Sequence, residues 1–399
     1  MSVKKRKICV VVFSRANYGR IRTAMRAIQK HPDLELQLIV GASAILPRYG
    51  DIRPLLEKDG FEPDAVIYSL VEGETPLTMA KTTGITIVEL STIFANLNPD
   101  AVITVADRFE TLSTAVTASY MNIPLAHTQG GEVTGSIDES VRHAVTKLAH
   151  IHFPATKKSA ENVIRMGERP ENVFMVGCPA MDIFHEIDVS QLPDMSQYSG
   201  VGDKPDLTKP YVVVMQHPVT TEYGMGTEQI EETIRAVSRL GVSAIWLWPN
   251  SDAGSNDVAK GIRVFREENN ATGISFFKNF GVKDYARLIA NCQCLIGNTS
   301  SGLREGAVLG VPTVSVGSRQ AGREHAENVI FTDYSADQIY KAARKQIDHG
   351  RYEPSGIFGD GKAGEKIADV MATVRFDINK RLTYVDEASV SHGGLKVAG

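Results

Sequence analysis

The stretch "KICVVVFSRANYGRIRTAMRAIQKHPDLELQLIV" (residues 7–40) joins two apolar runs through an amphipathic segment. The runs at 7–13 and 34–40 have the length and the continuous apolar character of buried strands, whereas residues 18–30 have helical periodicity. Strands of this kind that alternate with helices are typical of parallel sheets covered by helices on both faces. The stretch therefore predicts an α/β fold.

The same alternation continues along the chain. In the first half, further strand-like runs lie at 99–105, 122–127, 150–155 and 173–177, with helix-like stretches at 108–121 and 157–166. In the second half, strand-like runs lie at 211–217, 243–250, 274–277, 292–298 and 312–316. Two Rossmann-like units in tandem are therefore expected.

Residues 186–210 interrupt the alternation. They contain three prolines and many polar residues without a sustained period, which is typical of a linker. We therefore expect an N-terminal domain at 1–185, a linker at 186–210 and a C-terminal domain at 211–369. The length of 399 residues suits two domains of roughly 150 to 200 residues each.

Composition and charge exclude several classes of function. The formal net charge of −4 and the pI of about 6.2 leave no large basic field for nucleic acid or an anionic membrane. No window approaches the roughly 20 apolar residues of a membrane span, and the run after "MSVKKRK" is a first strand rather than a signal peptide. Four scattered cysteines lack zinc-site spacing, so we expect a cytoplasmic protein with reduced thiols.

Polar residues and glycines gather where the predicted strands end. In open parallel sheets, ligands bind beyond the carboxyl ends of the strands. The segments at these ends are "SRANYGR", "ADRFE", "HTQGGE", "QHPVTTE", "PNSDAGS", "GNTSSG" and "GSRQAGRE". We expect both halves to direct them at one shared cleft.

The segment "HTQGGEVTGSIDESVRHA" (residues 127–144) crowds ionisable groups after a predicted strand. Ser136 and Glu139 fit a capping box, so a helix is expected to begin at Ile137. In that helix Asp138 and Arg142, and likewise Glu139 and His143, are four residues apart. We interpret the Glu139 pair as solvated support for the helix.

Asp138 points to chemistry instead. The Gly130–Gly131 turn is expected to bring it close to Glu132 and to His127 at the strand end. Neighbouring carboxylates raise one another's pKa, which is how a general acid or base is tuned. Asp107, after the strand at 99–105, is read equally well as an N-cap or as a functional carboxylate.

The second half offers a candidate phosphate site in "IGNTSSGLREGAVLGVP" (residues 296–312). A helix is expected to start near Thr299 or Ser300 and to end at Gly310, so its first N–H groups either hold phosphate or form an ordinary N-cap. Glu305, about a turn and a half into that helix, is placed to accept hydrogen bonds from a ribose. The P-loop pattern is absent.

Three further residues are candidates for ligand contact. Arg319 and Arg323 follow the next strand and complement phosphate. His217 ends the first strand of the second half, where a functional role is favoured over a cap. Arg15 is read equally well as a phosphate or sugar contact and as a surface charge.

As a set, these motifs resemble the hydrolysing UDP-N-acetylglucosamine 2-epimerases of sialic-acid and related nonulosonic-acid biosynthesis. The resemblance spans about residues 6–365 through "RANYG", "ADRFE", "HTQGGEVTGSIDESVRHAVTKLAH", "QHPVTTE", "PNSDAGS", "GNTSSGLRE" and "GSRQAGRE". It implies a glycosyltransferase-B-like fold, in which two Rossmann-like domains face a central cleft. A C-terminal helix near 370–390 is expected to pack back on the first domain.

The resemblance also implies a reaction. A base removes the C2 proton while UDP leaves C1, giving 2-acetamidoglucal, and water then adds with inversion at C2 to release N-acetylmannosamine. No metal or redox cofactor is expected. The implied partners are a UDP-sugar substrate and further copies of the chain, as a homodimer or homotetramer.

Single residues carry over to the matching positions. The resemblance and the crowded segment together give seven catalytic candidates: Asp107, Glu132, Asp138, His217, Gln129, His127 and Arg142. The UDP-binding candidates are Arg15, Arg108, Asn250, Gly297, Thr299, Ser300, Glu305 and Arg319.

Three positions depart from the pattern of the family. Ala106 stands for the glycine of Gly-Asp-Arg, and Asn17 replaces a usual acidic residue. Gln129 stands where some members have a catalytic glutamate and others a histidine. Since an amide transfers no proton, proton transfer falls to Asp107, Glu132, Asp138 and His217.

Three other functions stay open. The same chemistry on UDP-2,4-diacetamido-2,4,6-trideoxyglucose differs only at C4 and C6 of the sugar, and no residue decides between the two substrates. A glycosyltransferase of the same fold would keep the C2 configuration, and the carboxylate cluster argues against it. A nucleotide-sugar sensor would bind without turnover.

Overall fold

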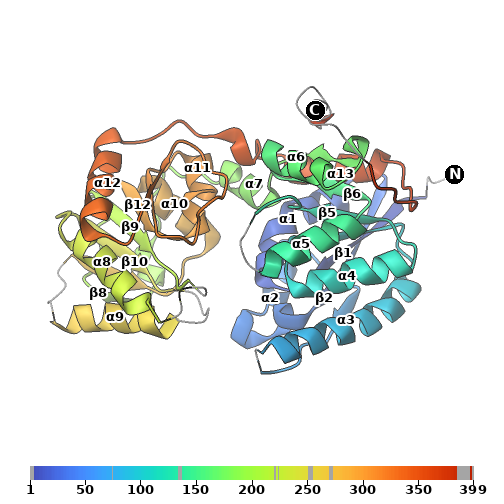
Figure 1. Ribbon diagram of the computed structural model, residues 1–399, viewed down its shortest axis with the longest axis horizontal. Helices are drawn as coiled ribbons and strands as arrows, with labels where there is room; N and C mark the ends of the chain where they lie inside the picture. Colours follow the sequence, from blue (N-terminus) through green and yellow to red (C-terminus); the bar gives the residue numbers. More distant parts are fainter. Residues whose placement is uncertain are drawn as a thin grey trace. The chain divides into compact units, whose positions relative to one another are not determined.

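The computed structural model describes residues 4–73, 75–133, 137–219, 222, 224–249, 255–268, 273–383 and 396–397. It divides into two compact units (Figure 1). Unit 1 comprises Met1–Ile183 and Gly359–Gly399, and unit 2 comprises Phe184–Phe358.

Unit 1 is built on a six-stranded parallel sheet in the order β3-β2-β1-β4-β5-β6. Its strands are β1 (Arg6–Val12), β2 (Leu34–Gly41), β3 (Ala65–Ile67), β4 (Ala101–Val105), β5 (Leu125–Thr128) and β6 (Ile151–Phe153). The strand–helix–strand reading of residues 7–40 is confirmed by β1, α1 (Arg15–Lys30) and β2. Ser14 caps α1, because its hydroxyl accepts a hydrogen bond from Asn17 N at 3.1 Å.

Helices cover both faces of this sheet, as continuous apolar strands require. Alternate residues of β1 separate the two cores: Ile8, Val10 and Val12 pack on one side, and Cys9 and Val11 on the other. The first face is covered by α1, α2 (Arg53–Asp59) and α13 (Ala363–Thr373). The second is covered by α3 (Pro76–Leu97), α4 (Phe109–Tyr120) and α5 (Ile137–Leu148) (Figure 1).

Unit 2 has a seven-stranded sheet in the order β14-β13-β12-β9-β10-β11-β8. Its strands are β8 (Gly200–Gly202), β9 (Tyr211–Met215), β10 (Ser243–Leu247), β11 (Ile274–Phe277), β12 (Cys294–Gly297), β13 (Thr313–Val316) and β14 (Val329–Thr332). All pair in parallel except the edge strand β8, which is antiparallel to β11. One face is covered by α8 (Gly226–Ser238), α9 (Ser255–Glu268) and α12 (Ala336–His349), and the other by α10 (Val282–Asn291) and α11 (Glu305–Leu309).

The segment predicted as a linker, residues 186–210, contains β8 and packs on unit 2. The Tyr198 hydroxyl donates to Asp284 at 2.7 Å, and its ring lies 4.6 Å from that of Phe280. The segment is therefore part of unit 2 rather than a separate linker, although it is largely irregular apart from β8 and the 3-10 turn Met195–Gln197. Its polar composition concealed the strand because edge strands are short and partly exposed.

The predicted strand at 173–177 also differs. Only β7 (Phe174–Met175) forms there, and it pairs with β15 (Lys396–Val397) outside the six-stranded sheet.

The C-terminal part of the chain returns to unit 1. The predicted helix near 370–390 lies earlier, as α13, and the chain leaves unit 2 after Phe358 rather than at 369. Ile367, Ala368 and Met371 of α13 are buried in the core of unit 1 with Ile21 and Met25 of α1. Among the described helices, none is both long and apolar enough to cross a membrane.

Candidate active site

Functional candidates of unit 1 meet at the carboxyl ends of β4 and β5. Asp107 follows β4 in the turn before α4, and Gln129 follows β5. Ala106 and Gln129 both have left-handed backbones, with φ of 61° and 60°. This conformation costs a non-glycine residue roughly 1–2 kcal/mol, so the surrounding bonds must hold it.

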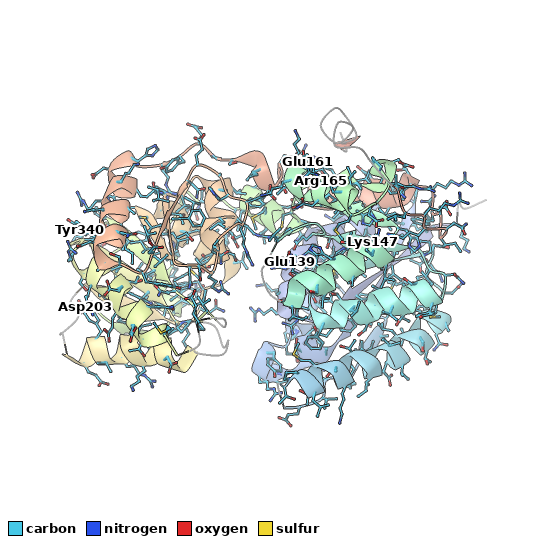
Figure 2. The ribbon with its side chains drawn as sticks, in the orientation of Figure 1. Glu139, Lys147, Glu161, Arg165, Asp203 and Tyr340 are labelled. Carbon is cyan, nitrogen blue, oxygen red and sulfur yellow. The ribbon has the colours of Figure 1, made fainter. Side chains whose placement is uncertain are left out.

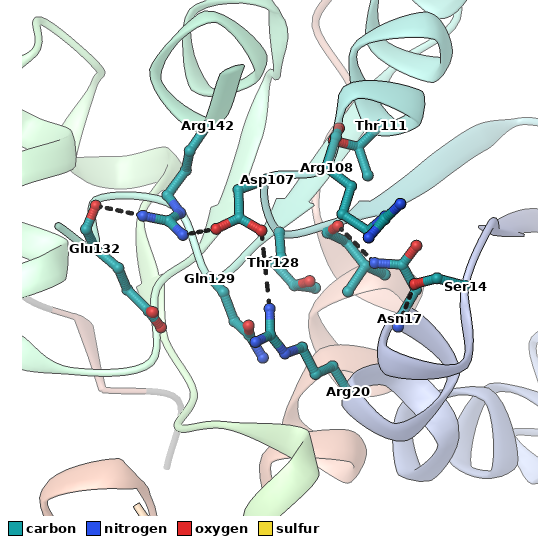
Figure 3. A network of polar contacts seen from close by, with 12 residues as sticks. Ser14, Asn17, Arg20, Asp107, Arg108, Thr111, Thr128, Gln129, Glu132 and Arg142 are labelled. Atoms are coloured by element: carbon teal, nitrogen blue, oxygen red, sulfur yellow. Dashed lines mark hydrogen bonds and ion pairs between the residues drawn. The ribbon is translucent and has the colours of Figure 1, made fainter. Parts of the chain in front are cut away.

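Asp107 is placed between two arginines. Arg142 of α5 contacts Asp107 Oδ2 through Nη2, and Arg20 Nη1 of α1 lies 3.9 Å from Oδ1 (Figure 3). Arg142 also donates from Nη1 to the carbonyl oxygen of Glu132 at 2.7 Å. The Arg142 side chain is only 2% exposed, so this ion pair fixes the carboxylate in a largely desolvated place.

His127 supports the turn that carries Asp107. Its Nε2 lies 2.8 Å from the Ala106 carbonyl oxygen, and its Nδ1 lies 3.1 Å from Thr146 Oγ1. Burial lowers the pKa of His127 to about 3, against the opposing effect of the Ala106 bond. The sequence grouped His127 with the acid–base candidates, but its ring is fully buried and neutral, with both nitrogens engaged.

Two buried amides, Asn17 and Gln129, occupy positions where the sequence departs from the pattern of the family. Gln129 donates to Cys178 Sγ at 3.3 Å, and Asn17 donates from Nδ2 to Val105 O at 3.3 Å. Within the described chain, the Oδ1 of Asn17 and the Oε1 of Gln129 have no hydrogen-bond partner. Unpaired buried acceptors are rare, and here they offer neutral acceptors beside Asp107.

The Gly130–Gly131 turn leads to Glu132 as expected. Gly131 has a φ of 79°, and a Cβ there would lie 2.1 Å from Ser159 O, so only glycine fits. Asp138 and Glu139 are in the first turn of α5.

Helix α5 begins at Ile137, as predicted, while Ser136 of the predicted capping box lies outside the described residues. The predicted Glu139–His143 pair is present at 3.4 Å, and both side chains are partly exposed; Figure 2 labels Glu139. Arg142 extends from the same helix to Asp107.

The arginines expected to contact UDP are placed differently from each other. Arg108 is the N-cap residue of α4 and forms a fork with the fully buried carboxylate of Glu110, at 3.1 and 3.2 Å. Arg15 is the exposed first residue of α1.

In unit 2, Asn298 connects the expected ligand-binding loops. It accepts from His217 N at 2.7 Å and donates to His217 O at 2.8 Å. Its own carbonyl accepts from Arg319 at 3.2 Å and from Gln320 at 2.9 Å. Asn298 thus holds His217 and Arg319 beside the end of β12.

The predicted helix from Thr299 to Gly310 is broken. Thr299 caps a single 3-10 turn, Ser300–Gly302, and Glu305 begins the five-residue helix α11 rather than lying inside a longer one. A helix this short supplies little macrodipole, so the phosphate-site prediction rests on hydroxyls and loop N–H groups. Gly297 precedes this turn with a φ of 133°, and Asn250 lies outside the described residues.

Sequence reasoning missed Arg20 and Asn298. Arg20 was not chosen because it lies inside a predicted helix rather than directly after a strand, although the segment "SRANYGR" contains it. Asn298 stands in "GNTSSG" between two chosen residues, and its signal was the position after a buried strand.

Sequence comparison identifies relatives over nearly the whole chain. The family model described as UDP-N-acetylglucosamine 2-epimerase matches residues 26–372. The UDP-N,N'-diacetylbacillosamine 2-epimerase (hydrolyzing) of Legionella pneumophila is 32% identical over 92% of this chain and 96% of its own. The UDP-N-acetylglucosamine 2-epimerase of Neisseria meningitidis is 27% identical over 92% and 95%.

Solved structures show the same fold. The Neisseria meningitidis UDP-GlcNAc 2-epimerase bound to UDP-GlcNAc matches with a TM-score of 0.74 at 15% identity, over 92% of this chain and 99% of that one. A putative UDP-N-acetylglucosamine 2-epimerase from Listeria monocytogenes matches with a TM-score of 0.74 at 16% identity, over 92% and 96%. The predicted α/β, glycosyltransferase-B-like fold class is confirmed. The chain belongs to the UDP-N-acetylglucosamine 2-epimerase family.

Proposed function

We propose that this protein is a hydrolysing UDP-N-acetylglucosamine 2-epimerase that releases N-acetylmannosamine and UDP. The observation that carries the proposal is the Asp107 carboxylate, held by Arg142 and Arg20 at the carboxyl ends of the strands of unit 1. A carboxylate fixed this firmly suits a reaction that needs a positioned charge near a weakly acidic carbon.

The proposed chemistry has two steps. A base takes the C2 proton, the C–H electrons form the C1=C2 bond, and the C1–O bond breaks as UDP leaves. Water then adds its hydroxyl to C1, and a proton returns to C2 on the opposite face. Gln129 transfers no proton, so we assign the acid–base steps to Asp107, Glu132, Asp138 and His217.

We propose that cationic and hydroxyl side chains bind the UDP leaving group. Arg319, Thr299 and Ser300 of unit 2 supply charge and hydrogen bonds to the diphosphate, and Glu305 accepts from the ribose. Gly297 allows the end of β12 to lie close to the backbone of β9, because a Cβ at position 297 would lie 2.0 Å from Met215 O. Arg15, Arg108 and Asn250 are the further proposed contacts.

A second substrate is favoured by one relative and two side chains. The Legionella pneumophila relative is named for UDP-N,N'-diacetylbacillosamine, which is the 2,4-diacetamido-2,4,6-trideoxy sugar. The free acceptors of Asn17 and Gln129 suit amide N–H donors, of which this sugar has two. We therefore keep it as the alternative substrate.

One experiment tests both substrates. Each UDP-sugar is incubated with the protein in heavy water, and the products are followed by NMR. The proposal predicts release of UDP together with deuterium at C2 of a sugar inverted at that carbon. Hydrolysis without label or inversion would exclude the epimerase reaction, and binding without turnover would indicate a sensor.

We also propose that the chain assembles as a homodimer or homotetramer through α3. This 22-residue helix carries only Lys81 and Glu89 as charged residues. Leu77, Ile85 and Val88 are 65%, 41% and 66% exposed on the side away from the core. An apolar stripe of this kind is typical of a helix covered by another surface, and a second copy presents the same stripe.

A further inference from the structure

A series of hydrogen bonds in unit 1 connects the C-terminal segment with the turn that carries Asp107. Lys380 Nζ donates to the Thr146 carbonyl oxygen at 3.1 Å. Thr146 Oγ1 lies 3.1 Å from His127 Nδ1, and His127 Nε2 lies 2.8 Å from the carbonyl oxygen of Ala106. Each step joins a different element: the C-terminal segment, α5, β5 and the turn after β4.

The direction of every bond in this series is determined. A carbonyl oxygen only accepts, so His127 carries its proton on Nε2 and donates to Ala106. Nδ1 is then an acceptor, and the Thr146 hydroxyl donates to it. His127 therefore acts as a fixed donor with a single tautomer.

The packing leaves these groups no alternative position. His127 and Thr146 are both fully buried. A Cβ at Gly130 would lie 3.0 Å from His127 Nδ1 and 3.0 Å from Thr146 Oγ1. The backbone of the turn therefore packs directly against the two hydrogen-bonded side chains. The Ala106 backbone, which is left-handed at a cost, is held in place from this side.

Lys380 fixes the far end of α5. Besides Thr146 it donates to the carbonyl of Ala149, and its ammonium lies 2.5 Å from Glu168 Oε2. It therefore binds carbonyl oxygens in the last turn of α5 and just beyond its end, where a cation is favoured. Lys147 marks the same end of α5 in Figure 2. Lys380 lies beyond residue 372, where the match to the family model ends.

We propose that His127 and Thr146 are positioning residues that hold the Ala106 carbonyl and thereby aim Asp107, and that Lys380 anchors this pair from the C-terminal segment. The inference rests on the proposed function, because Asp107 matters only if its carboxylate meets the substrate. His127 itself takes no proton from the substrate.

Matched substitutions at His127 isolate the bond to Ala106. Glutamine places an N–H near the position of Nε2, whereas asparagine places its amide near Nδ1. His127→Gln is expected to keep kcat within about threefold of wild type, and His127→Asn to lower kcat by about 100-fold with little change in KM, the loss expected for a misplaced catalytic group. Equal kcat in the two variants, or a loss confined to KM, overturns the assignment.

Thr146 and Lys380 give independent tests if a His127 variant does not fold. Thr146→Ser keeps the hydroxyl and is expected to retain activity, whereas Thr146→Val is expected to lower kcat. Lys380→Met is expected to lower kcat, and Arg381→Met, at the exposed neighbouring residue, is the matched control. Equal activity of the serine and valine variants, or of the two methionine variants, contradicts the proposal.

The ¹⁵N chemical shifts of His127 separate this inference from the proposed function. An Nε2–H tautomer that persists from pH 5 to pH 8 supports the series of bonds even if neither UDP-sugar is turned over. An Nδ1–H tautomer overturns it even in an active enzyme. Absence of wild-type turnover with the expected tautomer rejects the proposed function alone.

Discussion

At the scale of the residue, the guanidinium of Arg142 restricts what position 107 tolerates. It is buried, and Asp107 is an anionic partner of it. Removing one member of a buried pair leaves a charge without compensation, which costs more than the pair contributes. Asp107 is therefore expected to matter for both stability and turnover.

Replacing Asp107 by alanine tests both roles. We expect Asp107→Ala to lower the free energy of unfolding by about 3 kcal/mol, because Arg142 loses its counter-charge. Turnover is expected to fall far more than UDP affinity, which calorimetry measures separately. The double variant Asp107→Ala, Arg142→Met is expected to regain part of the stability without activity; equal losses of turnover and affinity in the single variant would reassign Asp107 to binding.

At Ala106, a substitution is expected to raise the stability of the protein rather than lower it. Its φ of 61° suits glycine, so Ala106→Gly is expected to raise the free energy of unfolding by up to about 1 kcal/mol. Ala106→Val is expected to lower it, because a β-branched residue is disfavoured in this conformation. Chemical denaturation of the three proteins measures the order, and a less stable glycine variant would show that the backbone is unstrained.

Acid is expected to destabilise the protein partly through His127. Its pKa is about 3 in the folded chain and about 6.5 when unfolded, so unfolding takes up a proton between these values. Its contribution to stability is present above pH 6.5 and falls by about 2 kcal/mol between pH 7 and pH 5. As the pH falls, wild type should lose about this much stability relative to His127→Gln, so the denaturation midpoints of the two proteins should converge. Midpoints that change with pH in parallel would refute the prediction.

Glu168 acts at lower pH. Burial alone would raise its pKa, but hydrogen bonds and charges from His152, Lys147 and Lys380 lower it to about 2. Its stabilising effect is therefore present above the unfolded pKa of about 4.3 and is lost as the pH falls toward 2. Because His127 and Glu168 lose their stabilising effects over different pH ranges, a pH titration of stability distinguishes their contributions.

Sequence reasoning located the turn around Asp107 but not its contacts. Helical spacing placed Asp138 and Arg142 on one face of α5, since residues four apart face each other, but it gave no sign of the contact with Asp107. Asp107 lies 35 positions away from Arg142 on another element, and only the tertiary fold brings the two side chains together. His127 was likewise chosen as a catalytic candidate, and its full burial with both ring nitrogens engaged could not be derived from the sequence.

At the scale of the element, the order of the main strands was predictable, but their exact ends, several short elements and the helix α3 were not. The helix α1 was recognised because its apolar residues repeat with helical spacing, and the start of α5 was recognised because Ser136 and Glu139 fit a capping box. The region after β12 was read as one helix because Ser300–Leu309 contains good helix formers and a glycine stop. In the structure, the Asn328 side chain donates to the Gly302 carbonyl at 3.1 Å, and Arg304 is the N-cap residue of α11 rather than a residue inside one continuous helix.

Gly297 at the end of β12 offers a test at this scale. A Cβ there would lie 2.0 Å from Met215 O, so Gly297→Ala is expected to force β12 and β9 apart. Stability should fall by more than about 2 kcal/mol, the cost of a strained backbone combined with overpacking. Because Asn298 holds His217, UDP affinity should fall as well.

Gly356→Ala, in the same unit, is the matched control. Nothing lies within 4 Å of its Cβ position, and its φ is not in the left-handed region. Thermal unfolding and UDP titration of both variants give the comparison. A Gly297 variant as stable as the control would show that the strand ends can separate without cost.

At the scale of the whole molecule, the chain builds two α/β units and closes the first with its own C-terminal part. The sequence predicts two such units because the strand–helix alternation stops and restarts. The sequence placed the end of the second domain at residue 369, whereas the chain returns to unit 1 after Phe358. The difference arises because α13 is a short amphipathic helix whose composition would suit either unit. Gly364 settles its place: a Cβ there would lie 2.5 Å from the Thr23 backbone of α1.

The exposed stripe of α3 predicts the state of assembly. Val88→Glu places a charge among Leu77 and Ile85, where a second copy would have to desolvate it, so the assembly is expected to dissociate toward monomers. Val282→Glu, at a residue 49% exposed on α10 of unit 2, is the control. Light scattering coupled to gel filtration measures the mass of each. If the α3 variant keeps the wild-type mass while wild type is oligomeric, another surface mediates the assembly; a monomeric wild type would remove the proposal altogether.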